Sequence, residues 1–252
     1  MADKTLMSTK EWLRFRIFRP LLIGMGKAIA PFSSVGNPPI FSNELFPYTK
    51  LLEEKWPVIR KELEQVMKYH TSLPSIQEIQ HEQAVLTTDN NWKTFFFYGF
   101  GTKAEKNCEA CPETAKVLEQ IPDLLTAFFS IMYPKKHIPA HEGLFKGIVR
   151  THLGMIIPNN NAGNESRMQV GNETIYWKEG KAVVFDDTYR HEVWNDSDEI
   201  RVVLLIDTIR PFKKPFSSFN KSIINLIIGS AHVKDAVNNH KEWEGRFNKI
   251  FS

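Results

Sequence analysis

Residues 185–195 read FDDTYRHEVWN, a stretch in which ionisable and large apolar residues are interleaved. It contains the acids and histidine Asp186, Asp187, His191 and Glu192, and the large apolar residues Phe185, Tyr189, Val193 and Trp194. A solvated loop would explain the acids but not the aromatic residues, which are typical of a buried strand. A metal site at the mouth of a β-barrel would explain both.

The segments around this stretch have the pattern of short β-strands. From residue 127 onward, six segments rich in β-branched and aromatic residues are separated by Pro, Asn and Gly turns: AFFSIMYP, KGIVRTHLGMIIP, SRMQVGNETIYW, KAVVFDD, RHEVWN and RVVLLIDTI. Short strands that follow one another this closely favour a jelly-roll or cupin-like barrel.

The chain before this strand-rich half is predicted to be mostly helical. Residues 48–70 and 111–128 are expected to form helices, because their apolar residues recur at helical spacing. The aromatic run NWKTFFFYGFG at 91–101 is expected to form a strand between them. The predicted fold is therefore mainly β with an α-helical N-terminal part.

Two terminal segments flank a domain predicted to span 41–211. Residues 1–40 combine a basic, aromatic helix, interrupted at Pro20, with a linker rich in Pro, Gly and Ser. Such a helix either binds an anionic membrane surface or packs on its own domain. The tail, 212–252, has an apolar run too short to span a bilayer, and it either covers the barrel or joins the N-terminal segment at a membrane.

Composition and charge indicate an ordinary globular protein. The chain has 252 residues, of which 42% are hydrophobic and 24% charged, and this argues against disorder. A formal net charge of +3 is far below that of a dedicated nucleic-acid-binding protein, so no nucleic-acid partner is expected. Cys108 and Cys111, as reduced thiols or a local disulfide, lack the further ligands of a zinc site. With no secretory signal, we expect a cytoplasmic protein, free or peripheral on the inner face of the cytoplasmic membrane.

Histidines gather in the strand-rich half, which contains His137, His141, His152 and His191. His141 and His191 lie at the rims of predicted strands that a jelly roll brings together. They are therefore candidates for an imidazole pair that binds a divalent transition metal.

The same half carries buried cations. Arg150 and His152 alternate on one predicted strand, so both point to the same face. Arg201 opens another predicted strand, where a buried guanidinium requires an anion. That anion is either an internal acid such as Asp207 or a dicarboxylate co-substrate.

The run from residue 127 to 211 resembles the aspartyl/asparaginyl β-hydroxylase family of Fe(II)- and 2-oxoglutarate-dependent oxygenases. The motifs that carry the resemblance are RTHLG, W..G....FDD...HEVWN and RVVL..D, in this order and with family-like spacing. The upstream run NCEACPET resembles a bacterial branch of that family.

The resemblance implies a double-stranded β-helix that holds Fe(II) through His141 and His191. In most related oxygenases a third, acidic ligand follows the first histidine, but Gly143 stands at that place here. The resemblance implies that water replaces this ligand, oriented by Asp187. Within FDDTYRHEVWN, Phe185, Val193 and Trp194 are expected to pack the barrel.

The resemblance also implies how the co-substrates bind. 2-Oxoglutarate would chelate the iron through its keto-acid end, and Arg201 would bind its distal carboxylate. Ser130 and His152 would add hydrogen bonds, and Arg150 would complete the cationic wall. Reaction with O2 would yield succinate, CO2 and a hydroxylated product.

Three functions remain open at this point. The first is hydroxylation of an Asp or Asn side chain in a peptide or protein. The second is hydroxylation of an acyl chain of a membrane lipid, such as lipid A or an ornithine lipid, which the basic N-terminal segment and the NCEACPET run favour. The third is a barrel that binds metal and 2-oxoglutarate without catalysis.

Overall fold

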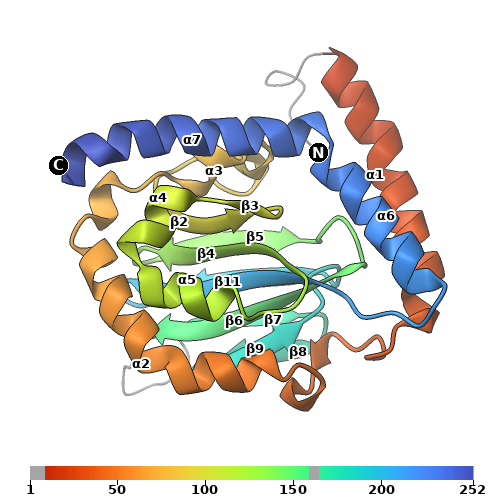
Figure 1. Ribbon diagram of the computed structural model, residues 1–252, viewed down its shortest axis with the longest axis horizontal. Helices are drawn as coiled ribbons and strands as arrows, with labels where there is room; N and C mark the ends of the chain where they lie inside the picture. Colours follow the sequence, from red (N-terminus) through yellow and green to blue (C-terminus); the bar gives the residue numbers. More distant parts are fainter. Residues whose placement is uncertain (1–8, 159–164, 252) are drawn as a thin grey trace.

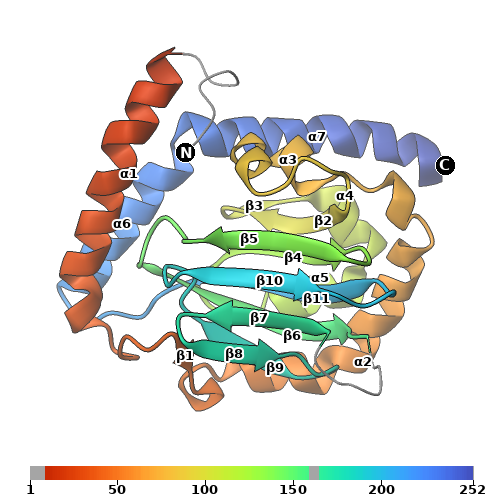
Figure 2. The same ribbon diagram turned by 180° about the vertical axis from the view of Figure 1, so that it is seen from behind.

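Two antiparallel β-sheets lie face to face at the centre of the computed structural model, which describes residues 9–158 and 165–251 (Figures 1 and 2). In sheet order, the seven-stranded major sheet consists of β1 (Ile40–Phe41), β9 (Ala182–Phe185), β6 (Ile148–Ile156), β11 (Arg201–Ile209), β4 (Leu124–Met132), β2 (Trp92–Gly99) and β3 (Thr102–Lys103). The four-stranded minor sheet consists of β5 (Lys136–His141), β10 (His191–Asn195), β7 (Ser166–Val170) and β8 (Glu173–Tyr176).

The central strand β11 shows why the major sheet is covered on both faces. Val203 and Leu205 belong to the apolar core between the two sheets. Val202, Leu204 and Ile206 alternate with them and belong to the core under the outer helices. A strand buried on both sides has a continuous apolar sequence, as RVVLLI does.

Helices cover the outer face of the major sheet. The long helix among them is α2 (Tyr48–Met67), which lies against β6, β9 and the short helix α5 (Pro112–Leu118), with α4 (Glu105–Ala110) beside it (Figure 1). Leu52, Ile59 and Leu63 of α2 are fully buried in the outer core. Their spacing of seven and four residues places them on one side of the helix.

The two ends of the chain meet on one flank of the sandwich. Helices α1 (Thr9–Ile29) and α6 (Phe216–Ile228) lie side by side there, and α7 (Ala231–Phe251) continues over β2 and α3 (Ile76–Ile79) (Figures 1 and 2). The tail therefore both covers the sandwich and joins the N-terminal segment. None of the helices within the described ranges is long and apolar enough to cross a bilayer. Single 3-10 turns complete the fold: η1 (Ala30–Phe32), η2 (Asn43–Leu45), η3 (His70–Ser72) and η4 (His81–Val85).

The predicted double-stranded β-helix is confirmed, as are the strand at 91–101 and the helix that begins at Tyr48. The segment SRMQVGNETIYW, expected as one strand, is a hairpin of β7 and β8. Its turn contains Gly171 at φ 58°, a left-handed conformation that glycine adopts without strain. Strand β5, which ends at His141, was not among the six predicted strands.

Two predicted helix boundaries are wrong. The helix expected over 111–128 ends at Leu118, and β4 begins at Leu124. The apolar run of β4 fits a helix by periodicity, but it lies in the middle of the major sheet between β11 and β2. The interruption expected at Pro20 is absent, since α1 runs through it. Pro20 is exposed, so the carbonyl that loses its donor lies on the solvent side of the helix.

Candidate active site

His141 and His191 face each other across neighbouring strands of the minor sheet. They are register partners in the β5–β10 pair, and their ring centroids are 4.1 Å apart. Nδ1 of His141 donates to the carbonyl of Pro139 at 2.8 Å, and Nδ1 of His191 donates to the carbonyl of Tyr189 at 3.0 Å. Because a carbonyl only accepts, each Nδ1 carries the proton and each Nε2 keeps a free lone pair.

Burial keeps both imidazoles neutral. Loss of hydration lowers the pKa of His191 to about 3, with a further contribution from His141, and burial also lowers the pKa of His141. The neutral ring is the form that coordinates a metal. The structure thus brings the two predicted ligands together in a suitable tautomer and charge state. No group of three or more His, Cys, Asp or Glu side chains in the described ranges is placed to hold a metal.

Asp187 fills the space that a side chain at position 143 would need. The backbone N–H of Gly143 donates to the Asp187 carbonyl at 2.7 Å, and a Cβ added to Gly143 would overlap the Asp187 carboxylate. An acidic side chain at position 143, two residues after His141, therefore has no room. The carboxylate of Asp187, on the turn before β10, occupies that region instead. Burial raises the pKa of Asp187 to about 6, against the opposing effect of Arg150.

Arg150 holds two acids beside the histidine pair. Its guanidinium binds the Asp207 carboxylate through Nε at 2.8 Å and Nη2 at 3.0 Å, and Nη1 lies 3.3 Å from Asp187. Both acids raise the pKa of Arg150. Arg150 and His152 share a face of β6 as predicted, but Asp207 pairs with Arg150 rather than with Arg201.

Arg201 and His152 lie on the inner face of the major sheet with polar atoms that lack partners. Arg201 is 1% exposed, and its Nε and Nη1 make no hydrogen bond to any described residue. Neither nitrogen of His152 has a partner, and the same is true of Nε1 of Trp177, whose ring lies 4.6 Å from the Arg201 guanidinium carbon. Burial lowers the pKa of Arg201 to about 9. Such a set of orphaned donors fits a buried anion that the protein itself does not supply.

A line of aromatic rings connects the two halves of the site. The Phe185 ring lies 6.1 Å from His191 and 4.9 Å from His152, and the Trp177 ring lies 5.8 Å from His152. Ser130, the remaining predicted residue, is buried on β4 opposite Val203 and accepts a hydrogen bond from the Trp92 indole at 3.0 Å.

The sequence model of the aspartyl/asparaginyl β-hydroxylase family matches residues 53–211. The chain belongs to this family. One relative, an ornithine lipid ester-linked acyl 2-hydroxylase from Rhizobium tropici, is 44% identical over 86% of this chain and 76% of its own length. An aspartyl/asparaginyl β-hydroxylase from Homo sapiens is 32% identical over 67% of this chain, and the match covers 22% of that longer protein.

Solved structures similar to this family member include cupin domains. A cupin 2 conserved barrel domain protein from Salinispora arenicola is 12% identical with a TM-score of 0.31, covering 56% of this chain and 92% of that one. A cupin_2 domain from Enterobacter cloacae is 11% identical with a TM-score of 0.32, covering 47% of this chain and 96% of that one. Likenesses this weak do not inform the site.

Several residues of FDDTYRHEVWN have roles that the family resemblance did not supply. Asp186 is fully buried and binds Arg210 at 2.7 Å and Lys146 at 2.9 Å. Trp194 was expected to pack inside the sandwich, and this prediction is wrong. Its ring stacks on His137 on the outer face of the minor sheet, because it follows Val193, which points inward. Glu192 binds Nε2 of His137 on that same outer face.

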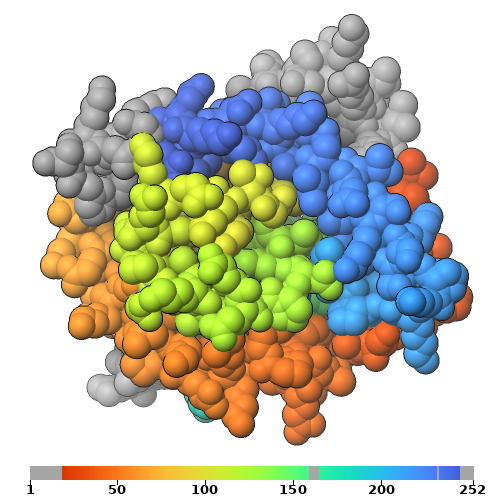
Figure 3. Space-filling model, in the orientation of Figure 1, coloured from red at the N-terminus to blue at the C-terminus, as the bar shows by residue number. Residues whose placement is uncertain are grey.

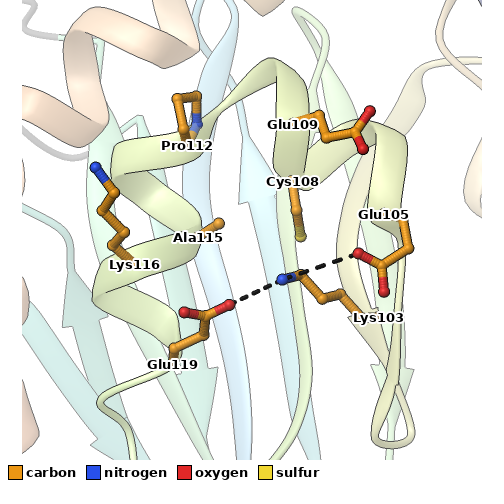
Figure 4. Close-up of a pocket in the computed structure, with 8 residues that line it drawn as sticks. All are labelled: Lys103, Glu105, Cys108, Glu109, Pro112, Ala115, Lys116 and Glu119. Carbon is orange, nitrogen blue, oxygen red and sulfur yellow. Dashed lines mark hydrogen bonds and ion pairs between the residues drawn. The ribbon is translucent and has the colours of Figure 1, made fainter.

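A separate pocket lies on the other side of the hydroxylase fold. It is formed by the edge strand β3 of the major sheet with α4 and α5, and it has Cys108 at its wall and Lys103 between Glu105 and Glu119 (Figure 4). Burial raises the pKa of the Cys108 thiol to about 12, and both cysteines are buried and free. None of the predicted site residues lines this pocket.

Proposed function

We propose that the chain is an Fe(II)- and 2-oxoglutarate-dependent hydroxylase that acts on the acyl chain of a membrane lipid. The observation that carries the reaction type is the pairing of two free imidazole Nε2 atoms with an anion pocket that has no internal acid. Open metal positions next to an anion pocket suit a metal-bound dicarboxylate.

The residues present fit both groups. His141 and His191 would hold the metal, and their carbonyl contacts fix the ring orientation. Arg201 would bind the distal carboxylate of 2-oxoglutarate, with hydrogen bonds from His152 and Ser130. When bound, Fe(II), O2 and 2-oxoglutarate supply the oxidation of a C–H bond, with release of succinate and CO2.

Asp187 and Arg150 would act beside the metal rather than on it. The Asp187 carboxylate lies in the space left by Gly143, where it would accept a hydrogen bond from a water molecule. Arg150 fixes Asp187 from one side and is itself fixed by two hydrogen bonds to Asp207. Because Asp187 and Asp207 offset the charge of Arg150, its role would be to hold Asp187 in position, and Arg201 would supply the positive charge for the co-substrate.

The relative from Rhizobium tropici supports the acyl-chain substrate, because its match extends over most of both chains. The match to the human protein supports the other candidate, an Asp or Asn side chain of a peptide, but it is confined to about a fifth of that protein. The free Nε2 pair and the orphaned donors would serve binding of metal and 2-oxoglutarate with or without turnover, so succinate formation is the measurement that separates the hydroxylase from a non-catalytic barrel.

Two measurements test the proposal. Purified protein with Fe(II) and 2-oxoglutarate should form succinate, and His141→Ala or His191→Ala should abolish this; retained turnover in either variant would exclude the ligand assignment. Mass spectrometry of lipids from cells with and without the gene should show an acyl chain that gains one oxygen. An unchanged lipid profile, together with oxygen gain in Asp- or Asn-containing peptides, would favour the peptide substrate instead.

A further inference from the structure

Positive charge is distributed unevenly along the chain. Residues 12–43 and 208–234 together contain nine Lys and Arg and no Asp or Glu, whereas the remainder contains 23 Lys and Arg and 29 Asp and Glu. The mild net charge of the whole chain therefore conceals two segments that are purely basic and a remainder in which acids outnumber bases.

The fold places these two segments against each other. The rings of Phe32, after α1, and Phe216, in α6, stack with centroids 3.8 Å apart. The backbone N–H groups of Ser34 and Lys213 donate across the junction, to Pro211 and to Phe32, at 3.0 and 3.2 Å. The helices α1 and α6 run side by side in both ribbon views, and α6 forms one flank of the space-filling view (Figures 1, 2 and 3).

The same flank exposes large apolar side chains. On α6, Phe219 is 46% and Leu226 is 65% exposed, and their separation of seven residues puts them on one side of the helix. On the adjoining N-terminal segment, Leu21 is 54% and Phe32 is 42% exposed. We call this set, with Leu144 of the β5–β6 loop at 37%, the α1–α6 face. Side chains of this size are costly to leave in water when they gather on one surface.

Free cations accompany the apolar residues. Lys27, Lys213 and Lys214 are exposed and make no ion pair within the part of the chain that the structure describes. Lys221 is different, because it binds Asp123 at 2.8 Å. The face thus combines apolar side chains with unpaired positive charge, and no acid lies in either segment.

The α1–α6 face adjoins the candidate active site. The β5–β6 loop begins directly after His141, and its Phe145 lies in one apolar cluster with Leu22 of α1 and Ile223 of α6. Gly26 of α1 lies so close to Lys146 that an added Cβ would be 3.0 Å from its backbone nitrogen. The two helices are therefore anchored to the loop that leads to the metal ligands.

We propose that the α1–α6 face docks on an anionic lipid bilayer, with Phe219, Leu226, Leu21 and Phe32 entering the interface and the lysines contacting acidic headgroups. Basic, partly apolar helices bind such interfaces through both contributions. Docking in this orientation brings the end of the sandwich that carries His141 to the membrane surface. The inference concerns a partner surface and goes beyond the proposed reaction.

The test is co-sedimentation of the full-length protein with vesicles of phosphatidylglycerol and phosphatidylcholine, or of phosphatidylcholine alone. We expect binding to the anionic vesicles and little binding to the neutral ones. Phe219→Glu/Leu226→Glu and Lys213→Glu/Lys214→Glu should each raise the lipid concentration needed for half-binding by about tenfold or more. Matched controls on other surfaces, Val85→Glu and Lys55→Glu/Lys61→Glu, should bind as the parent does.

Vesicle binding is measured without iron or 2-oxoglutarate, so its outcome is independent of the proposed hydroxylation. Equal binding by the parent and both α1–α6 variants, or no binding to anionic vesicles, would overturn the proposal. Sedimentation velocity tests whether a second copy of the chain occupies the α1–α6 face instead. If the parent is a dimer and Phe219→Glu/Leu226→Glu is a monomer, the face serves self-association and not membrane docking. Far-UV circular dichroism and thermal unfolding unchanged from the parent show that the variants are folded.

Discussion

Gly143 and Asp187 share one small volume beside the histidine pair: the amide of Gly143 donates to the Asp187 carbonyl, and any side chain on Gly143 would meet the Asp187 carboxylate. Glycine is therefore required at a place where most related oxygenases carry an acidic metal ligand. Gly143 lies in the loop after β5, and its missing side chain makes room for the carboxylate of Asp187 on the turn before β10.

Gly143→Asp should destabilise the protein by about 2 kcal/mol, because overpacking of a filled site costs about 1–3 kcal/mol. Adding Asp187→Gly should recover much of this loss, since it empties the space that the new side chain enters. Urea denaturation measures both. Gly24→Asp is the matched control, because nothing lies within 4 Å of a Cβ at Gly24. A double variant no more stable than Gly143→Asp would contradict the shared volume.

Arg201→Met should leave the metal-free protein as stable as the parent or more stable, because it removes a buried cation that has no acid partner. It should weaken 2-oxoglutarate binding by about 100-fold, since hydrogen bonds to charged groups contribute about 1.5–3 kcal/mol each. Anaerobic calorimetry with Fe(II) measures the affinity. Arg150→Met is the contrasting variant, expected to lose about 3 kcal/mol of stability because Asp187 and Asp207 become unpaired.

Arg210→Met should destabilise the protein by about 3 kcal/mol, the lower end of the range for breaking a buried ion pair, because Lys146 still binds Asp186. Arg210 is 1% exposed, and it joins Asp186 to the linker through Ser33, Gly36 and Asn37. Thermal and urea unfolding measure the loss. Lys221→Met removes an ion pair at the surface and should cost at most about 1 kcal/mol. Equal losses of stability in the two variants would contradict the larger contribution expected of the buried ion pair.

Stability should fall in acid through His240, which α7 buries against Phe96. Burial lowers its pKa to about 4 from 6.5, so the unfolded chain takes up a proton that the folded protein does not. The stability is present above pH 6.5 and is lost as the pH falls towards 4, by up to about 3 kcal/mol. His240→Gln should make this part of the pH profile less steep, and the slope that remains is expected from the buried His141 and His191, whose pKa values are also lowered.

The fold was predictable where periodicity and turn residues agreed, as in β6 and β11, but the hairpin around Gly171 was expected as a single strand. It was not predictable at Leu124–Met132, where an apolar run fits both a helix and a strand buried on two faces. Only the pairing of β4 with β11 and β2, which are distant in sequence, decides between them.

The site was predictable from residue types but not from their connections. The motifs identified His141, His191 and Arg201, and the structure brings the two histidines together. The sequence did not decide whether Asp207 is the acid that pairs with Arg201, because both residues lie in one predicted strand and the pattern does not show which side chains meet. Their separation of six residues puts them at opposite ends of β11, where Asp207 meets Arg150 instead. Trp177 was unassigned, since nothing in its local sequence reveals an indole over a guanidinium.

The apolar core shared by α1, α6 and the β5–β6 loop joins residues inside the region that the family model matches to residues outside it. The family match ends at residue 211, yet Leu22, Ile223 and Ile227 beyond its borders bury the same apolar cluster as Phe145 within it. A fragment cut at the borders of the family model would therefore leave the apolar surface around Phe145, four residues after His141, without the helices that cover it. The apolar core beside His141 thus extends beyond the matched region, and segments from both ends of the chain complete it.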